Sequence, residues 1–286
     1  MAASRQAPVA SSFGSHYFSL VVPPVHIVVC IKQVPDTAEV RIDPERGTLI
    51  REGVESILNP LDAYAIEAAV SLRERLGGTV TALSMGPPQA EAALREAVAR
   101  GCDEGLLLSD RAFAGADTWA TSYALCCAVR RLSDVQLVLC GKQAIDGDTA
   151  QVGPGLATFL DWPQATCVRR ILEAGEDALT VERLTDWGDE VLAVPLPAVL
   201  TVLKDLNFPR LPSLVSQMRA RRCDVRRWGP QQVDGDPAQF GLAGSPTQVY
   251  KVNFVVLETA DSRQISADEE GIAALLEELV QEYIVG

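Results

Sequence analysis

The sequence predicts an α/β protein built on a Rossmann-like, mostly parallel sheet with helices on both faces. Short apolar runs bounded by turn residues are typical of strands buried on both sides, and longer segments with helical spacing lie between them. Strands that alternate with helices at such intervals leave room for crossovers between parallel strands. The runs are residues 26–31, 79–85, 105–108 and 135–140.

Each expected helix begins at a recognisable signal. Asn59 is a helix-capping residue type, and the proline that follows it is favoured at the first helical position. Pro88 and Asp117 give similar signals for the next helices along the chain. The spacing of residues 151–160 predicts a further helix after the last apolar run.

The C-terminal third changes character twice. Beyond residue 161 the chain turns to shorter β-type segments, of which 198–203 is the clearest, and we expect them to extend the same sheet. From about Arg226 it is rich in Gly, Pro, Gln and Asp, and it then predicts an apolar strand at 252–257 and an amphipathic helix at 268–284. The segment from Arg226 onward contains too few large side chains to form a hydrophobic core of its own. We therefore expect a C-terminal arm that packs on a partner subunit.

These observations divide the chain into parts. Residues 25–225 are expected to form the nucleotide-binding α/β domain, and residues 226–286 the C-terminal arm and helix. Residues 1–24 contain no acidic side chain and a single arginine, and we expect a disordered extension there. An organelle transit peptide has a similar composition, so the mitochondrial matrix remains an alternative to the cytoplasm.

Composition excludes several classes of function. A formal net charge of -13 is unsuited to binding nucleic acid or an anionic membrane surface. No uncharged apolar run reaches about 18 residues, so membrane insertion is not expected. The seven cysteines contain no Cys-x-x-Cys pair and the only histidines are His16 and His26, so neither a metal site nor imidazole catalysis is expected. Buried reduced thiols without a secretory signal fit the cytoplasm.

The most informative segment is residues 141–154, which directly follows a predicted strand and opens a helix. In open α/β sheets, ligands bind beyond the carboxyl ends of the strands, where the N-terminus of the next helix attracts an anion. Gly141 and Gly147 would let the backbone approach a ligand, and Thr149 would cap the helix or donate to a phosphate. This context suits a nucleotide pyrophosphate. Neither the dinucleotide fingerprint nor the NTPase loop is present, so a purely structural turn stays an alternative.

Two aspartates in this segment, Asp146 and Asp148, are unsuited to a phosphate contact. We expect them to accept hydrogen bonds from helix N–H groups or ribose hydroxyls, with Lys142 offsetting part of their charge. The chemistry would then belong to a bound flavin or nucleotide, and no catalytic side chain is expected.

Six segments of the sequence match one known family. They are Val-Cys-Ile-Lys-Gln-Val-Pro-Asp (29–36), Leu-Asn-Pro-Leu-Asp-Ala-Tyr-Ala-Ile-Glu (58–67), Met-Gly-Pro-Pro-Gln (85–89), Cys-Gly-Lys-Gln-Ala-Ile-Asp (140–146), Asp-Trp-Pro-Gln-Ala-Thr (161–166) and Pro-Arg-Leu-Pro-Ser-Leu (209–214). In them the chain resembles the β subunits of electron-transfer flavoproteins. The resemblance runs from about residue 25 to the end of the chain.

The resemblance implies an αβ heterodimer, in which this subunit holds an adenine nucleotide and the α subunit carries FAD. Transferred position by position, the cofactor-binding residues come from the first strand, the start of the first helix and the ends of two other strands. They are Cys30, Asn59, Pro60, Leu61, Asp62, Met85, Gly141, Lys142, Gln143, Ala144, Ile145, Asp146, Gly147, Asp148, Thr149, Ala150, Gln151 and Val152. A helix cap alone remains an alternative role for Asn59 and Pro60.

The nucleotide is either FAD or AMP. Family members that hold AMP typically have a second aspartate directly after Ala-Ile-Asp, whereas this chain resembles the flavin-bifurcating branch in having Gly147 there. A glycine leaves space for a second phosphate and the flavin to leave the adenosine pocket. Residues 241–247 also resemble that branch. We therefore favour FAD, and the alternative is a non-bifurcating β subunit with a structural AMP.

The flavin-bifurcating branch implies particular redox partners. NADH would reduce the FAD of this subunit by hydride transfer. One electron would pass to the FAD of the α subunit and on towards an acyl-CoA dehydrogenase, and the other to ferredoxin or flavodoxin. A nucleotide-binding regulatory module would share the fold but would leave the C-terminal arm unexplained.

The chain departs from the family near the expected dehydrogenase contact. That neighbourhood is an apolar loop centred on Leu211 and Leu214, followed by the basic residues 218–227. Phe208 stands where the family often has Glu, and arginines replace a lysine-rich stretch. A solvated basic turn remains the alternative for residues 218–227.

Overall fold

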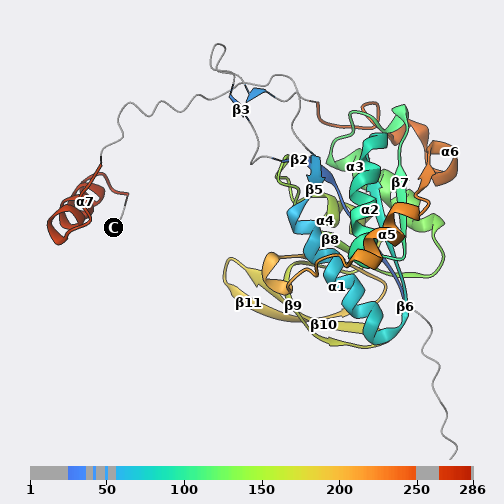
Figure 1. The fold of residues 1–286 in the computed structure, drawn as a ribbon, viewed down its shortest axis with the longest axis horizontal. Coiled ribbons are helices and arrows are strands. Elements are labelled where there is room, and N and C mark those ends of the chain that lie inside the picture. Colours follow the sequence, from blue (N-terminus) through green and yellow to red (C-terminus); the bar gives the residue numbers. More distant parts are fainter. Residues whose placement is uncertain (1–24, 37–40, 43–48, 51–55, 249–263, 285–286) are drawn as a thin grey trace, which may run out of the picture. The chain divides into compact units, whose positions relative to one another are not determined.

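The structure of the chain is a computed structural model, which describes residues 25–36, 41–42, 49–50, 56–248 and 264–284 (Figure 1). They fall into two compact units, and the main unit contains residues 25–36 and 56–248. The expected extension at 1–24 and the expected strand at 252–257 lie outside the described residues.

The main unit is built on a nine-stranded sheet with the order β11-β10-β9-β12-β8-β1-β6-β7-β13. Along this spatial order, every neighbouring pair in the stretch β9-β12-β8-β1-β6-β7-β13 is parallel. The remaining strands form a hairpin-like edge, in which β10 runs antiparallel to both β9 and β11. The strands are β1 (Val25–Cys30), β6 (Gly78–Met85), β7 (Glu104–Leu108), β8 (Val135–Gly141), β9 (Gln164–Ala174), β10 (Ala178–Thr185), β11 (Gly188–Pro195), β12 (Ala198–Val202) and β13 (Arg226–Trp228).

The four strands predicted from apolar runs form the centre of this sheet, in the order β8-β1-β6-β7. Most of their residues are apolar on both faces because both faces of each strand are covered. Ile27, Val28 and Val29 on β1 are all fully buried, although they point alternately to opposite faces. The predicted α/β fold with a mostly parallel sheet is confirmed.

Helices cover both faces of the sheet (Figure 1). Helices α1, α2 and α5 pack on the face that carries Ile27 and Val29, whereas α3 and α4 pack on the face that carries Val28. The sheet therefore separates two apolar core layers. The helices of the main unit are α1 (Pro60–Leu76), α2 (Glu91–Arg100), α3 (Thr118–Arg131), α4 (Val152–Leu160), α5 (Leu214–Arg222) and α6 (Pro230–Val233), with short 3-10 turns η2 (Pro88–Ala90), η3 (Arg111–Phe113), η4 (Lys204–Leu206) and η5 (Pro237–Gln239).

The predicted helix starts are confirmed, with one difference in how a helix is capped. The Asp117 side chain caps α3 by accepting the Ala120 N–H at 3.0 Å. Asn59 stands at the cap position of α1, but its side chain makes no cap bond to that helix. Its side chain bonds elsewhere, as described below.

The main unit extends further along the chain than the expected boundary at residue 226. Strand β13 pairs with β7 at the sheet edge. Phe240 is buried in the core, with its ring 5.1 Å from that of Phe113. The unit therefore continues to Gln248, because a few apolar side chains in a Gly- and Pro-rich segment fill the core of the domain rather than a core of their own.

The second unit contains a short strand pair and the predicted C-terminal helix. The strands are β3 (Arg41–Ile42) and β4 (Leu49–Ile50), and a similar pair in the main unit joins β2 (Gln33–Pro35) to β5 (Ser56–Leu58). Helix α7 (Glu269–Gln281) begins after Asp268, whose carboxylate accepts the Gly271 N–H at 2.8 Å. Ile272, Leu276 and Val280 on α7 are about half exposed. No helix within the described ranges is long and apolar enough to cross a bilayer.

Candidate functional site

The carboxyl ends of β1, β6 and β8 meet at a point where the chain changes direction across the sheet. From β1 the chain builds β6 and β7 on one side, and it later returns to place β8 and β12 on the other. Such a switch point is where ligands bind in open α/β sheets. Cys30 ends β1 opposite Leu83 of β6 and Cys140 of β8. The loop after β8 therefore leaves the sheet beside the end of β1.

Asn59 and Asp62, at the start of α1, link these strand ends. One Asp62 oxygen accepts the Lys32 N–H at 2.8 Å, and the other accepts Nδ2 of Asn59 at 2.9 Å. The Gly141 N–H also bonds this carboxylate. Burial raises the pKa of Asp62 to about 7, although the three hydrogen bonds and the charge of Lys32 act in the opposite direction.

The Asn59 carboxamide also holds the loop after β8. Its Nδ2 donates to the Gln143 carbonyl at 2.9 Å, and its Oδ1 accepts the Ile145 N–H at 3.2 Å. The side chain is 1% exposed. Asn59 is thus a bridge between α1 and the loop, so the alternative in which it acts only as a helix cap does not hold.

Lys32 supplies the positive charge at this edge. Its Nζ lies 2.7 Å from Oδ1 of Asp146, and both side chains are partly exposed. Lys142 was expected to offset part of the charge of the aspartates, and the cation that pairs with Asp146 is Lys32. Lys32 was not among the expected site residues. Its position directly after a buried strand, at the edge where ligands bind, could have identified it from the sequence.

The loop from Lys142 to Gln151 is largely exposed at its tip. The Gln143 side chain bonds the Asp148 carboxylate, and the Asp148 N–H bonds the Ala144 carbonyl at 2.9 Å. Asp148 and Ala150 adopt left-handed backbone conformations, with φ of 51° and 54°. No heavy atom outside its chain neighbours lies within 4 Å of the position of a Cβ on Gly147. Space is therefore open at Gly147.

Gly141 has a different role from the one expected. A Cβ at this position would lie 2.4 Å from Oδ1 of Asp62 and 2.8 Å from the carbonyl carbon of Leu61. The glycine thus allows α1 to approach the end of β8, and its missing side chain serves packing within the protein rather than the approach of a ligand.

Gly141→Ala is expected to lower the free energy of unfolding by about 1–3 kcal/mol or more, the typical cost of forcing atoms into a packed site. Gly147→Ala is the matched control, and its stability should change little because its Cβ meets nothing. Urea denaturation of both variants measures the difference. Equal stabilities would contradict the packing role of Gly141.

Helix α4 presents its N-terminus to the same edge. Gln151 occupies the cap position without a side-chain cap bond, so Thr149 does not cap this helix, and its alternative role as a phosphate donor stays a prediction. The Gly155 N–H makes the first bond back, to the Gln151 carbonyl at 2.9 Å. The N–H groups of Val152 and Gly153 belong to the first turn, before the first hydrogen bond within the helix. The positive end of the helix dipole adds to their attraction for an anion.

The structure brings the predicted residues to one edge of the sheet. Cys30 and Met85 end β1 and β6, Pro60 and Leu61 open α1, and the loop and first residue of α4 complete the set. Cys30 and Cys140 are neighbours on adjacent strands, and the hydrogen bond between their thiols, together with burial, raises the pKa of Cys140 well above its ordinary value. Within the described part of the chain, no three His, Cys, Asp or Glu side chains gather as a metal site.

A second surface lies on the loop before α5 and on α5 itself. Four large apolar side chains are strongly exposed there. They are Phe208 (96%), Leu211 (86%), Leu214 (74%) and Val215 (77%). We call this set the apolar loop surface.

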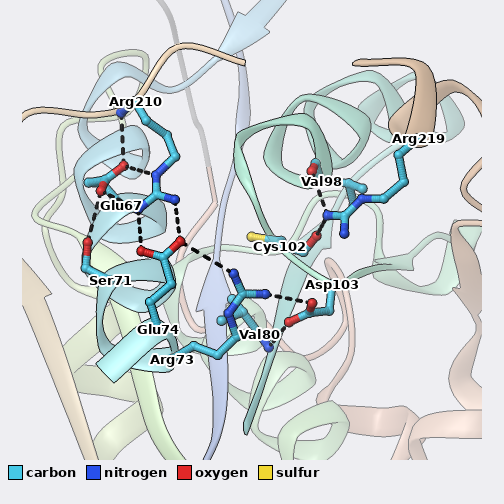
Figure 2. A network of polar contacts seen from close by, with 10 residues as sticks. All are labelled: Glu67, Ser71, Arg73, Glu74, Val80, Val98, Cys102, Asp103, Arg210 and Arg219. Atoms are coloured by element: carbon cyan, nitrogen blue, oxygen red, sulfur yellow. Dashed lines mark hydrogen bonds and ion pairs between the residues drawn. The ribbon is translucent and has the colours of Figure 1, made fainter. Parts of the chain in front are cut away.

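Arg210 fixes the apolar loop surface to α1 (Figure 2). Its guanidinium donates to both oxygens of Glu67 at 2.9 Å and to Glu74 at 2.6 and 3.0 Å, and its backbone N–H also bonds Glu67. Burial would raise the pKa of Glu67, but the bonds from Arg210 and Ser71 outweigh it and hold that pKa below its ordinary value.

Other arginines hold α5 and β13 to the main unit. The Arg219 guanidinium donates to the carbonyls of Val98 and Cys102, at 3.2 and 2.7 Å (Figure 2). Arg226 and Arg227 pair with glutamates of the main unit. Much of the predicted basic patch at 218–227 is therefore bonded to the domain, and Arg221 and Arg222 are among its exposed charged residues.

Arg210→Ala is expected to lower the free energy of unfolding by about 1–3 kcal/mol at pH 7, less than for a fully buried ion pair because Arg210 is partly exposed. The carboxylates stabilise the fold above their ordinary pKa of 4.5, and this contribution is lost as the pH falls through the lowered pKa of Glu67. The difference between variant and wild type should therefore shrink below that pH. Urea denaturation at pH 7 and pH 4 measures it, with exposed Arg221→Ala as the control. A difference that stays constant with pH would contradict this account.

A family model and individual relatives both show which known proteins this chain is similar to. A family described as "Electron transfer flavoprotein domain" matches residues 46–232. Electron transfer flavoprotein subunit beta of Thermoanaerobacterium thermosaccharolyticum is 48% identical over 262 residues, which cover 91% of this chain and 100% of the relative. Subunit CarD of the caffeyl-CoA reductase-Etf complex of Acetobacterium woodii is 50% identical, covering 79% and 87%. Protein FixA of Azotobacter vinelandii is 46% identical, covering 80% and 83%.

Proposed function

This chain belongs to the electron transfer flavoprotein family, as a β subunit that acts with an α subunit, and we propose that it binds FAD at the edge formed by β1, β8 and α4. The observation that carries the proposal is the meeting of the Lys142–Gln151 loop, the Lys32–Asp146 pair and the α4 N-terminus at the switch point of the sheet. Each of these is suited to a different part of a dinucleotide.

The residues at this edge fit a nucleotide. The N–H groups of Val152 and Gly153, at the positive end of α4, would hold a phosphate. Asp146 would accept a hydrogen bond from a ribose hydroxyl, and Lys32 would offset the negative charge of that carboxylate beside the phosphates. A bound flavin supplies the hydride and single-electron chemistry, while the protein supplies position and charge.

The choice of FAD over AMP is supported by Gly147. The open space at this position leaves a path past the loop for the part of FAD that extends beyond AMP. The likeness to CarD, a subunit of a caffeyl-CoA reductase-Etf complex, also favours a role in a larger redox complex. The alternative is a β subunit with a structural AMP, in which the α subunit's flavin does all the redox work.

We further propose that NADH is the electron donor, and that electrons leave by two routes, to an acyl-CoA dehydrogenase and to ferredoxin or flavodoxin. The apolar loop surface is the proposed contact with the dehydrogenase, because strongly exposed apolar side chains on a rigid base are typical of binding sites. Arg221 and Arg222 beside it would suit an acidic rim on the partner. The bacterial relatives favour a cytoplasmic location.

Anaerobic mixing of the two-subunit complex with NADH tests the proposed electron transfer. We expect bleaching of flavin absorbance, and reduction of ferredoxin only when a dehydrogenase and its acceptor substrate are also present. A complex that accepts electrons from a reduced dehydrogenase substrate but never from NADH would instead support the AMP-holding alternative.

A further inference from the structure

Asn59 and Asp62 are buried and already bonded within the protein, at 1% and 5% exposure. Both N–H donors of the Asn59 carboxamide are used, one to Asp62 and one to the Gln143 carbonyl, and its oxygen accepts the Ile145 N–H. The Asp62 carboxylate accepts N–H groups of Lys32, Asn59 and Gly141. The two side chains therefore face the protein and not a ligand.

We propose that Asn59 and Asp62 are positioning residues, which hold the 142–148 loop in its nucleotide-binding shape, and that they do so only while Asp62 is ionised. Asn59 fixes the two backbone groups on either side of Ala144 in that loop. Asp62 ties Asn59 to the ends of β1 and β8, through Lys32 and Gly141. The inference rests on the proposed nucleotide function, since it explains how that site is kept in shape.

Protonation of Asp62 would break this arrangement. Three N–H groups point at its carboxylate, and a proton on it would replace an acceptor with a donor, so that one N–H group would lose its partner. Because burial raises the pKa of Asp62 to about 7, the change falls in the neutral range. The site is held together above that pH and loosens as the pH falls below it.

The other titratable groups around Asp62 are few. Lys32, on the loop after β1, is paired with Asp146 on the loop after β8. The thiols of Cys30 and Cys140 end those two strands, and the pKa of Cys140 is raised well above its ordinary value, with Asp62 among the causes. Cys140 therefore stays neutral between pH 6 and 8, and Asp62 is the group whose surroundings give it a pKa of about 7.

Nucleotide affinity as a function of pH tests the proposal. The purified two-subunit complex is freed of nucleotide and titrated with AMP, the part shared by both candidate ligands, and with FAD. The affinity of the wild type is expected to fall about tenfold from pH 8 to pH 6, as the ionised fraction of a group of pKa 7 does. With FAD, whose phosphates do not titrate between pH 6 and 8, the isosteric Asp62→Asn should bind weakly at every pH, with a flat profile. Asp146→Asn, in the same loop, should weaken binding but keep the pH dependence of the wild type.

Hydrogen exchange of the Ile145 amide gives a readout that needs no ligand. In the nucleotide-free complex at pH 8, this amide should exchange slowly in the wild type and in Asp146→Asn, and at least tenfold faster in Asn59→Leu and Asp62→Asn. Failure of the wild type to bind either probe would refute the proposed function, and the exchange rates would still test the positioning role. An Asp62→Asn complex with wild-type pH dependence and wild-type protection of Ile145 would overturn the inference.

Discussion

Gly147→Asp is expected to remove the flavin from this subunit and leave the flavin of the α subunit in place. No heavy atom outside its chain neighbours lies within 4 Å of a Cβ at this position, so the chain itself accommodates the new side chain. Its carboxylate would add a negative charge to a loop that already carries Asp146 and Asp148, beside the phosphates that the α4 N-terminus would hold. The loss of flavin would therefore result from repulsion between the new carboxylate and the ligand, and not from a clash within the protein.

Flavin content and NADH-dependent reduction measure this effect together. The variant should contain AMP or no nucleotide in this subunit, should lose NADH oxidation coupled to ferredoxin, and should still accept electrons from a dehydrogenase. Gly147→Ala is the matched control, because it adds a side chain without charge and should lose less flavin. A Gly147→Asp complex that keeps both flavins and full NADH reactivity would show that this position does not decide between FAD and AMP.

Leu214→Asp is expected to reduce kcat/KM for electron exchange with the dehydrogenase by about a hundredfold, the effect of losing an apolar anchor at a protein interface. Leu214 is 74% exposed at the start of α5, so the substitution should leave the fold intact. The loss should appear mainly in KM, since docking and not the flavin is changed. Steady-state kinetics with varied dehydrogenase concentration measure it.

The controls for Leu214→Asp are a conservative variant and the nucleotide content. Leu214→Met keeps the apolar volume and should behave as the wild type. Both variants should retain wild-type nucleotide content and NADH reactivity, because Leu214 does not lie among the residues at the β1, β8 and α4 edge. Unchanged dehydrogenase kinetics in Leu214→Asp would exclude the apolar loop surface as the docking site.

The sequence predicted the sheet and its helices because local patterns determine them. Strands β1, β6, β7 and β8 are predominantly apolar, and they could be identified without knowledge of their neighbours. The boundary at residue 226 was wrong because β13 and Phe240 join the domain through contacts that no local pattern reveals. A Gly- and Pro-rich composition predicts little regular structure, but it does not say where the few apolar side chains pack.

The sequence predicted where the candidate site lies on the sheet, but it often did not predict what individual side chains do there. Lys32 and Asp146 are 114 positions apart, so their ion pair could not be derived from spacing. Gly141 was assigned to ligand approach, although the atoms it must avoid belong to Leu61 and Asp62. Asn59 was recognised as a cap residue type, yet its bonds go to the loop after β8. Each of these roles depends on which strands become neighbours.

The nucleotide content of the purified two-subunit complex tests the central claim most directly. Acid extraction releases the nucleotides bound by both subunits, and chromatography separates FAD from AMP. Our account predicts FAD as the only nucleotide, in twice the molar amount expected from the α subunit alone. AMP in an amount equal to that of FAD would contradict it, because the site at β1, β8 and α4 would then hold a nucleotide without redox chemistry.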